Sequence, residues 1–224
     1  MKKRLIITVD GPAGAGKSTV SKILAQRLSY VYLDTGALYR AVAYKVIDET
    51  ISPDNNKAIS DLCGRIKISL KNMNGKLNVF VDDENVTEKI RHEDIGLLAS
   101  KVSAIPIVRA SLLSVQRDVG RRGGIVAEGR DMGTVVFPDA DYKFYLEASV
   151  DERVRRRSGE LRTLGNKVDF LKVKGDLILR DRQDQEREIA PLKACDGAFI
   201  IDSTNMTVSE VVEKMISVIE SQKR

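Results

Sequence analysis

A glycine-rich segment near the N-terminus constrains the fold of this chain more than any other feature. The sequence VDGPAGAGKST covers residues 9–19, and its spacing from Gly11 to Ser18 fits the pattern G-x-x-x-x-G-K-[ST]. In this pattern, backbone amides turn inward and cradle phosphate oxygens. The apolar run at residues 4–10 is typical of a buried parallel strand, and residues 17–28 carry apolar side chains at helical spacing. The segment therefore predicts a strand, a phosphate-binding loop and a helix in succession.

Strand-like and helical segments alternate along the rest of the chain. Apolar runs predict strands at residues 30–34, 123–137, 141–148 and 198–202, and helical spacing predicts helices at residues 35–49, 93–120, 149–188 and 207–219. We expect Thr35 to be the N-cap of its helix. Between residues 65 and 87, apolar and polar residues alternate around Asn74-Gly75, a favoured hairpin turn. This segment is expected to form a small antiparallel insert.

The alternation predicts a three-layer α/β fold with a parallel core sheet, a small antiparallel insert and a helical lid. A chain of 224 residues with 42% hydrophobic content suits one domain with one core. Within this single domain, residues 1–224, the expected parts are a core at about 1–60, 92–150 and 190–224, an insert at about 61–91 and a lid at about 151–189.

The charge balance favours a small anionic ligand over a nucleic acid. The net charge is +5 and the pI about 9.1, which is mild for a dedicated nucleic-acid-binding protein. Residues 150–190 hold eleven basic and nine acidic side chains, whereas a groove that follows a nucleic-acid backbone is more uniformly basic. The chain has no Trp, six Tyr and five Phe, and so little surface for stacking bases. We expect no nucleic-acid partner.

Cysteine content and hydropathy predict a cytoplasmic protein without a membrane partner. Cys63 and Cys195 lie far apart without a partner motif, so neither a disulfide framework nor a zinc site is indicated. The N-terminal apolar run LIITV is shorter than the roughly 7 to 15 residues of a signal peptide core. No apolar run approaches the roughly 18 residues that a membrane-spanning helix requires. Because no long apolar stripe is left over, we expect a monomer.

The phosphate-binding loop predicts specific contacts to a nucleotide. Its glycines permit a close approach of the backbone, and the following helix directs its positive end at the phosphates. Lys17 is expected to reach the β- and γ-phosphates, Ser18 to ligate Mg²⁺ through its hydroxyl, and Thr19 to add a phosphate contact. The alternative is an ordinary glycine turn between a strand and a helix. The loop identifies a phosphate, and it leaves the reaction open.

Charged residues in the second half of the chain narrow the chemistry. Arg180, Asp184 and Arg187 are spaced by four and three residues, so they would share one face of a helix that Pro191 ends. Such a face offers guanidinium groups for phosphate and a carboxylate for hydroxyls, and the alternative is a solvated salt-bridge ladder. The arginines of residues 153–157 are either lid groups that contact the transferred phosphate or a solvated face.

The segment EGRDMGT, residues 128–134, follows a buried strand directly and so lies at the carboxyl edge of the sheet, where ligands bind. Arg130 can hold a phosphate, Asp131 can accept a hydrogen bond from an exocyclic amino group, and Glu128 could support the water shell of a metal. The alternative is an ordinary polar exit from the strand. The single histidine, His92, lies in a polar segment, is expected to be exposed and is assigned no catalytic role.

With these residues assembled, the sequence resembles the bacterial cytidylate kinase family of P-loop nucleoside-monophosphate kinases. The resemblance covers nearly the whole chain and rests on TVDGPAGAGKST, YLDTGALYRAVA, ASKVSAIPIVRASL, EGRDMGTVVFPDAD, RDRQDQEREIAPL and AFIIDST, which occur in the family's order. It implies transfer of the γ-phosphoryl group of ATP, with Mg²⁺, to CMP or dCMP. The insert would be the acceptor-binding subdomain that bacterial members carry.

The resemblance also implies site residues. ATP would bind at Gly11, Pro12, Ala13, Gly14, Ala15, Gly16, Lys17, Ser18 and Thr19. The CMP phosphate would lie among Arg40, Arg130 and Arg187, the cytosine against Ser100, Arg109 and Asp131, and the sugar against Arg180 and Asp184, with Thr35 as a further contact. Lys17, Arg130, Arg187 and the lid arginines Arg153, Arg156 and Arg157 would be catalytic, and the metal would be held by Ser18 and, through water, by Glu128.

Two positions depart from the family's pattern, and other functions remain open. Thr35 stands where some members have Ser, and Glu128 where some have Asp, so the longer Glu128 leaves its metal role open. A kinase of UMP, AMP or shikimate would share the P-loop, and a nucleic-acid-dependent ATPase would show hydrolysis stimulated by polynucleotides. A GTP-dependent switch would need the guanine-reading sequence N-K-x-D, and the only match by letter, NKVD at residues 166–169, lies within the predicted lid.

Overall fold

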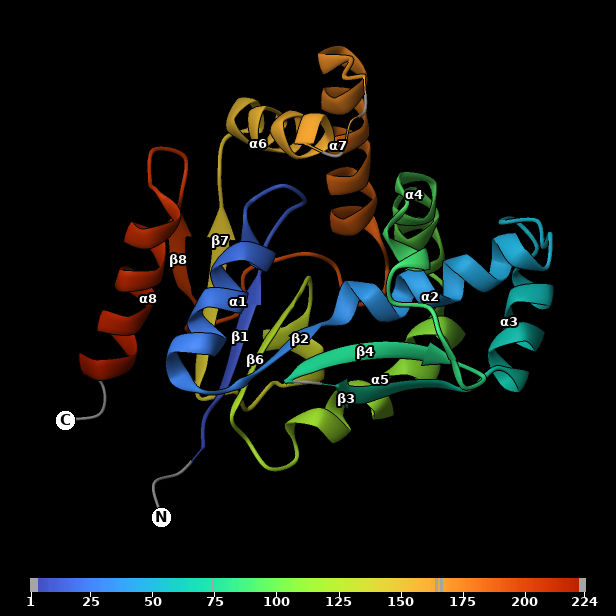
Figure 1. The fold of residues 1–224 in the computed structure, drawn as a ribbon, viewed down its shortest axis with the longest axis horizontal. Helices are drawn as coiled ribbons and strands as arrows, with labels where there is room; N and C mark the ends of the chain where they lie inside the picture. The colour runs from blue at the N-terminus through green and yellow to red at the C-terminus, as the bar shows by residue number, and fades with distance from the viewer. Residues whose placement is uncertain (1–3, 74, 164, 166, 222–224) are drawn as a thin grey trace.

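The computed structural model describes residues 4–73, 75–163, 165 and 167–221. At its centre is a five-stranded sheet in the order β2-β6-β1-β7-β8, in which every neighbouring pair is parallel. The strands are β1 (Ile6–Asp10), β2 (Val31–Asp34), β6 (Ile125–Gly129), β7 (Tyr142–Glu147) and β8 (Phe199–Asp202). Because all five run in one direction, their carboxyl ends meet at one edge of the sheet (Figure 1).

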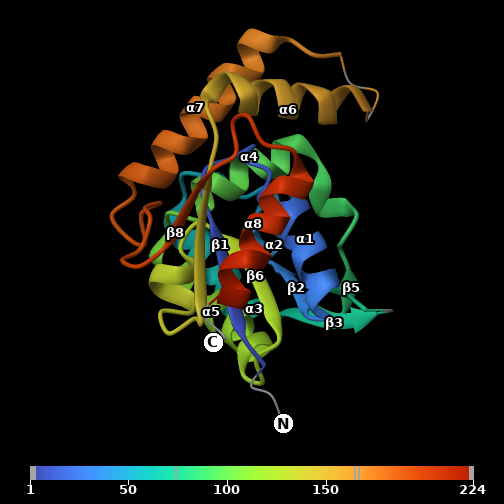
Figure 2. The same ribbon diagram turned by 90° about the vertical axis from the view of Figure 1, so that its left-hand side faces the viewer.

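Helical layers cover both faces of this sheet. Helices α1 (Lys17–Leu28) and α8 (Val208–Ser221) pack side by side on one face (Figure 2). A short π-helix, η2 (Met132–Val136), covers the other face together with α5 (Pro106–Gly120). Side chains of β6 alternate between these layers: Val126 joins one apolar core, and Ile125 and Ala127 join the other. The predicted three-layer α/β fold with a parallel core sheet is confirmed.

A third apolar core lies beside the sheet, where the insert packs on helices. The helices of this side are α2 (Thr35–Asp48), α3 (Asn56–Arg65), η1 (Lys89–Arg91), α4 (Glu93–Val102) and α5. The insert is an antiparallel sheet of β3 (Ile68–Met73), β4 (Lys76–Val81) and β5 (Glu84–Asn85). It confirms the predicted hairpin, although Asn74 of the predicted turn lies outside the described residues. Helix α3 was not predicted.

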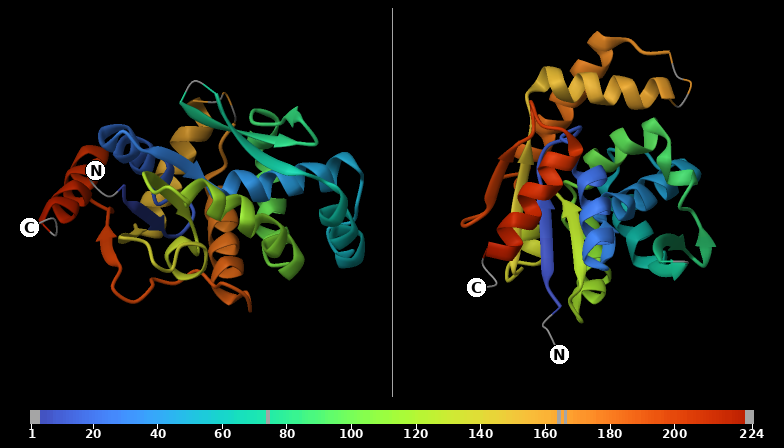
Figure 3. Two further views of the ribbon diagram at one scale, coloured as in Figure 1. Left: turned by 90° about the horizontal axis from the view of Figure 1, so that it is seen from below. Right: turned by 60° about the vertical axis from the view of Figure 1, so that its left-hand side comes forward.

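Two charged helices form the predicted lid. Helices α6 (Val150–Thr163) and α7 (Phe170–Glu186) lie above the carboxyl edge of the sheet (Figures 1 and 3). They pack on each other through Val154, Leu161, Val173 and Leu177, and this cluster includes Ala13 of the loop after β1. The lid therefore touches the phosphate-binding loop. The residue numbers at which the chain divides into core, insert and lid stay a prediction.

Three local predictions were wrong. The strand predicted over 123–137 ends at Gly129. The π-helix η2 begins at Met132, where the amides of Met132 and Gly133 donate to the carboxylate of Asp10 at the end of β1. The helical stretch at 93–120 is broken between α4 and α5, where Pro106 starts a new helix at 101° to the previous one. Asp34, and not Thr35, is the N-cap of α2, because its carboxylate accepts from the amide of Ala37 at 3.1 Å.

Within the described residues, no single helix is long and apolar enough to cross a bilayer. Helices α4 and α5 reach the necessary length only when taken together, across their 101° bend.

Candidate active site

The loop after β1 folds tightly enough to require glycine at two positions. Gly11 has φ of 146°, and a Cβ there would lie 2.0 Å from the carbonyl oxygen of Leu146. Gly16 has φ of 91° and is the N-cap of α1, so the free amides at the start of that helix face the loop. Lys17 Nζ donates to the carbonyl of Pro12 at 2.6 Å. The structure thus forms the predicted phosphate-binding loop around the ammonium group of Lys17.

Lys17 is an unusual cation because it is buried and forms no ion pair with any described residue. Its side chain is in the interior, and burial lowers its pKa to about 7, with the positive charge of Arg130 acting in the same direction. A phosphate beside it would favour the charged ammonium form. A bound anion would therefore supply the negative charge that the ammonium group of Lys17 needs.

Asp10 at the end of β1 is a buried carboxylate that the sequence analysis missed. It accepts hydrogen bonds from the amides of Met132 and Gly133 at 2.9 and 2.8 Å, and it thereby fixes the start of η2. Burial raises its pKa to about 6 despite these bonds. The sequence feature that could have identified it is its position, because it is the charged last residue of an apolar run.

The raised pKa of Asp10 predicts a pH-dependent stability. Because Asp10 binds its proton more tightly in the folded state, its contribution to stability is lost as pH rises from 3.8 to about 6, by about 3 kcal/mol. Asp10→Asn removes this titration. Denaturant unfolding of both proteins is measured at pH 4 and pH 6.5. The free energy of unfolding of the wild type, relative to that of the variant, is expected to be higher at pH 4 than at pH 6.5 by about that amount. A difference that does not change with pH would contradict the raised pKa.

Glu128 and Tyr32 form a buried pair next to the loop. The Tyr32 hydroxyl donates to Glu128 Oε1, and among the described residues no donor reaches Glu128 Oε2. Burial, reinforced by the charge of Asp34, raises the pKa of Glu128. The Thr35 hydroxyl donates to the carbonyl of Glu128 at 2.7 Å. Tyr32 was not predicted, because nothing local links it to a residue of another strand.

Two buried aspartates organise the arginines expected to bind the acceptor. Asp184 accepts from Arg130 Nε at 2.6 Å and from the Ser100 hydroxyl at 3.4 Å. Asp131 forms a buried ion pair with Arg109, and Arg187 Nη2 lies 3.6 Å from its other oxygen. These six residues come from α4, α5, α7 and the carboxyl end of β6. The structure therefore brings together groups that are far apart in the sequence.

Several guanidinium groups in this cluster have donors without acceptors. Among the described residues, no hydrogen-bond partner reaches the buried atoms Arg40 Nε, Arg180 Nε and Arg187 Nη2. Burial lowers the pKa of Arg180 to about 10, and the neighbouring charge of Arg130 acts in the same direction. Arg40 is joined to Asp34 at 2.6 Å, at the end of the strand next to β6. Buried donors of one charge sign are a site for an anion.

The predicted helical face of Arg180, Asp184 and Arg187 lies at the end of α7. The helix ends at Glu186, and Arg187 is its C-cap, with φ −64° and ψ 139°. The chain then turns back, and the amide of Leu192 donates to the carbonyl of Asp184 at 2.7 Å. Arg187 Nη1 lies 3.8 Å from Asp184 at the predicted spacing of three residues.

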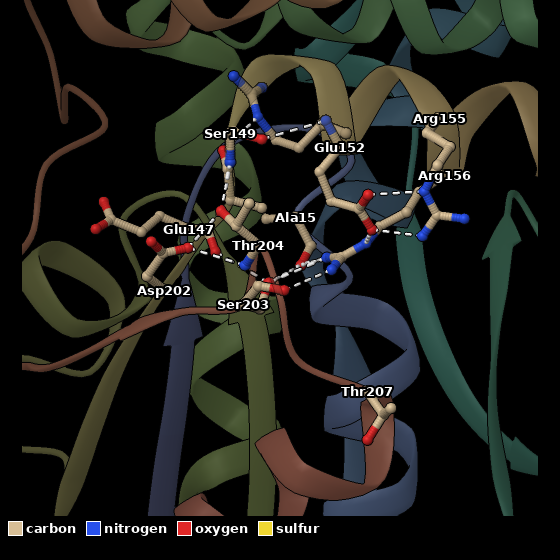
Figure 4. Close-up of polar contacts among 12 residues, drawn as sticks. Ala15, Glu147, Ser149, Glu152, Arg155, Arg156, Asp202, Ser203, Thr204 and Thr207 are labelled. Carbon is tan, nitrogen blue, oxygen red and sulfur yellow. Dashed lines mark hydrogen bonds and ion pairs between the residues drawn. The ribbon is translucent and has the colours of Figure 1, made fainter.

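The lid arginines contact the loop in different ways. Arg156 donates to the carbonyl of Ala15 at 3.1 Å, to the hydroxyl of Ser203 at 3.0 Å and to the carbonyl of Ser203 at 2.7 Å (Figure 4). Its Nε donates to the carboxylate of Glu152. Arg153 donates to the carbonyls of Ala13 and Ala148, both at 3.1 Å. Arg157 pairs with Glu160 on its own helix at 3.0 Å.

A pocket of about 290 Å³ lies between the loop, α6 and the start of α8. Its walls include Gly16, Arg156, Met206 and Val208, so both polar and apolar groups line it. The residues around 203–208 were missed, because the sequence analysis assigned AFIIDST only to a strand and its exit. The pocket is continuous with the phosphate-binding loop, and its size suits a small planar group.

The parallel sheet, the loop with its buried lysine and the two-helix lid above it define a P-loop kinase. The chain belongs to the cytidylate kinase family, whose model matches residues 7–221. It is 45% identical to a cytidylate kinase of Geobacter sulfurreducens over 223 residues, which is 100% of this chain and 96% of that relative. A cytidylate kinase of Caldicellulosiruptor bescii is 43% identical over 214 residues, covering 96% of this chain and 95% of that protein.

One solved structure is similar in fold. An uncharacterized protein from Eubacterium ventriosum superposes with a TM-score of 0.52 at 12% identity, over 98% of this chain and 99% of that one. At this identity the likeness concerns the fold alone.

Proposed function

We propose that this protein is a nucleoside-monophosphate kinase that transfers the γ-phosphoryl group of ATP to CMP or dCMP, giving ADP and CDP or dCDP. The observation that carries the proposal is a set of buried guanidinium donors on Arg40, Arg180 and Arg187, beside a phosphate-binding loop, for which the described residues supply no acceptor. A second phosphate site next to the first is what a kinase with a phosphate acceptor requires. The names of the relatives support a cytidine nucleotide as the acceptor.

ATP is proposed to bind across the loop and the adjoining pocket. Residues 11–19 would hold its phosphates, with Lys17 at the β- and γ-phosphates. The pocket walled by Arg156 and Val208 would take the base, since it lies beside the loop and offers an apolar side. Arg156 and Arg157 remain candidates for contact with the transferred group.

The acceptor is proposed to bind within the arginine cluster. Its phosphate would lie among Arg40, Arg130 and Arg187, which supply donors and positive charge. The assignments that complete this site are Ser100, Arg109 and Asp131 for the cytosine edge, Arg180 and Asp184 for the sugar, and Thr35 as a further contact. Asp184 and Asp131 hold Arg130 and Arg109 in place before the acceptor arrives.

The reaction needs positioning and charge neutralisation more than a general base. The second pKa of a monophosphate is about 6, so the attacking oxygen is already ionised at neutral pH. Donor and acceptor repel each other, and Lys17, Arg130 and Arg187 offset that repulsion so that the reacting atoms can approach in line. His92, the single histidine, is exposed and takes no part. Closure of the lid would exclude water and prevent hydrolysis of ATP.

Mg²⁺ enters the proposal as part of the Mg-ATP substrate. Glu128 Oε2 fits it, because it is a buried carboxylate oxygen without a donor among the described residues, close to the start of α1. Ser18 would offer its hydroxyl from the exposed first turn of that helix. When bound, the ion neutralises charge on the β- and γ-phosphates. Tyr32 holds the carboxylate of Glu128 in a fixed orientation.

We further propose that the protein works as a cytoplasmic monomer without a nucleic-acid partner. The thiols of Cys63 and Cys195 are free, which is compatible with a reducing compartment.

Measurement of ADP release tests the proposed function. Purified protein with Mg-ATP is assayed with CMP, dCMP, UMP, AMP, GMP, TMP and shikimate, with a polynucleotide, and without any acceptor. A response confined mainly to CMP and dCMP is expected. Preference for another acceptor would remove the assignments at Ser100, Arg109 and Asp131, and stimulation by the polynucleotide alone would replace the kinase by an ATPase.

Asp131→Asn is expected to weaken discrimination between CMP and UMP. The carboxylate can only accept a hydrogen bond, as the amino group of cytosine requires, whereas an amide can turn and donate to the uracil carbonyl. The ratio of kcat/KM for CMP to that for UMP should fall by about tenfold. Because Asp131 also pairs with Arg109, activity on both acceptors should decline.

The matched control is Asp139→Asn, the same change at an exposed position after the same strand. The control should keep the wild-type ratio. An unchanged ratio in Asp131→Asn would show that this carboxylate does not read the base.

A further inference from the structure

A buried ion pair binds both the N–H and the C=O of one residue of the phosphate-binding loop, Ala13. Asp181 on α7 accepts from the amide of Ala13 at 3.2 Å and pairs with Arg153 on α6. The same guanidinium donates to the carbonyl of Ala13 at 3.1 Å, and its Nε donates to the carbonyl of Ala148. One helix of the lid therefore holds the N–H of Ala13, and the other holds its C=O.

This arrangement leaves little freedom at the contact. The side chains of Arg153 and Asp181 are 6% and 13% exposed, so the pair is largely shielded from water. A Cβ added at Gly14 would lie 3.2 Å from the Cβ of Arg153, so the loop lies directly against α6. The peptide groups on both sides of Ala13 are thus fixed relative to the lid.

Packing alone does not require the pair. Val154, Leu161, Val173 and Leu177 already pack the two helices on each other and on Ala13. Burying two charges costs desolvation, and an apolar pair of similar volume would hold such helices together at least as well. What the charged pair adds is direction, because a carboxylate and a guanidinium set which way the amide and the carbonyl of Ala13 point.

From this geometry we infer that Asp181 is a positioning residue for the phosphoryl donor: through Arg153 and the amide of Ala13, it holds the phosphate-binding loop in the conformation that accepts Mg-ATP. It also links that conformation to the lid, since the two partners lie on α6 and α7. Asp181 itself need not touch a substrate. The inference rests on the proposed function only in taking ATP as the donor.

Asp181→Asn tests the inference by separating the two substrates. The amide keeps the size of the side chain but has one acceptor oxygen where the carboxylate uses two. It therefore cannot accept from the amide of Ala13 and from the guanidinium of Arg153 together, and it removes the counter-charge of that guanidinium. Titration calorimetry with Mg-ATP and, separately, with CMP is expected to show the Kd for Mg-ATP raised by about tenfold. The Kd for CMP should stay within about twofold of the wild-type value, because the Asp184 and Asp131 contacts are unchanged.

Asp151→Asn is the matched control. Asp151 on α6 pairs with Lys174 on α7 at 2.8 Å, so it joins the same two helices at an exposed position. Neither Kd should change in this variant. A Kd for Mg-ATP in Asp181→Asn that equals the wild-type value would overturn the inference, as would equal weakening of both substrates, which indicates a general loss of structure. A wild type that does not bind Mg-ATP at all would instead remove the proposed function.

A second variant keeps the test decisive if Asp181→Asn does not fold, as judged by the absence of a cooperative thermal unfolding transition. Arg153→Lys keeps the positive charge, but one ammonium group cannot reproduce the fork that reaches Asp181, Ala13 and Ala148 together. The same selective loss of Mg-ATP affinity is expected. Wild-type affinity for Mg-ATP in this variant would overturn the inference.

Discussion

Replacing Lys17 with alanine is expected to lower kcat for phosphoryl transfer by about a thousandfold. The Lys17 ammonium is buried inside the phosphate-binding loop, where its charge acts at short range and with little screening. Burial and the charge of Arg130 hold its pKa at about 7 in the free protein, so the folded chain gains little from the cation itself. Most of its interaction energy is therefore realised only with the charged phosphates.

The measurement is steady-state kcat with saturating CMP and Mg-ATP, together with the midpoint of thermal unfolding. We expect the midpoint to fall by no more than a few degrees, because the only hydrogen bond that the side chain makes to a described residue is the one to Pro12. Arg27→Ala is the control, since it removes a half-exposed cation from the other end of the same helix. A loss of kcat smaller than tenfold in Lys17→Ala would contradict the assigned role.

Arg187→Ala is expected to reduce kcat by tenfold to a thousandfold, with a smaller effect on KM for CMP. Its guanidinium is held by the carbonyl of Ala190 at 2.6 Å and lies within 4 Å of both Asp131 and Asp184. Its Nη2 has no hydrogen-bond acceptor among the described residues. This N–H group can therefore bind a phosphate oxygen as negative charge shifts from one phosphate to the other during transfer.

Arg182→Ala provides the comparison for Arg187→Ala. Arg182 lies on α7, and its side chain is 71% exposed and paired with Glu186. We expect this variant to keep wild-type kcat and KM. Near-normal turnover in Arg187→Ala would show that the arginine contributes to the fold of the cluster and not to the reaction.

The strands of the sheet were predictable because a parallel sheet buries both faces. The run at residues 4–10 is largely apolar for this reason, because β1 is the central strand of the sheet. The failures lie where a distant group decides the local structure. The strand predicted over 123–137 stops at Gly129 because Asp10, more than a hundred residues away, binds the amides of Met132 and Gly133. No local pattern encodes that contact.

The phosphate-binding loop was predictable because its residues are contiguous and the chemistry of each residue type explains its role in binding phosphate. The acceptor side is different, because Ser100, Arg109 and Arg187 lie on separate helices or their ends, and only the family resemblance suggested that they belong together. The spacing of Asp184 and Arg187 predicted their proximity, and the end of α7 at Glu186 was not predicted.

Residues whose partners lie in a distant segment were not found from the sequence alone. Asp181 binds the amide of Ala13 across 168 positions, and Tyr32 binds Glu128 across 96. Asp181 was overlooked between Arg180 and Asp184, which carry more obvious chemistry. Its partner is a peptide group, which any residue type provides, so the sequence holds no complementary signal.

The central claim is that the γ-phosphoryl group of ATP is transferred to the phosphate of CMP. Its most direct test is to incubate the protein with Mg²⁺, CMP and ATP that carries an isotopic label in the γ-phosphate, and then to separate and quantify the products. The label is expected in CDP, in an amount equal to the ADP formed. Label recovered mainly as inorganic phosphate, or in no cytidine nucleotide at all, would contradict the account.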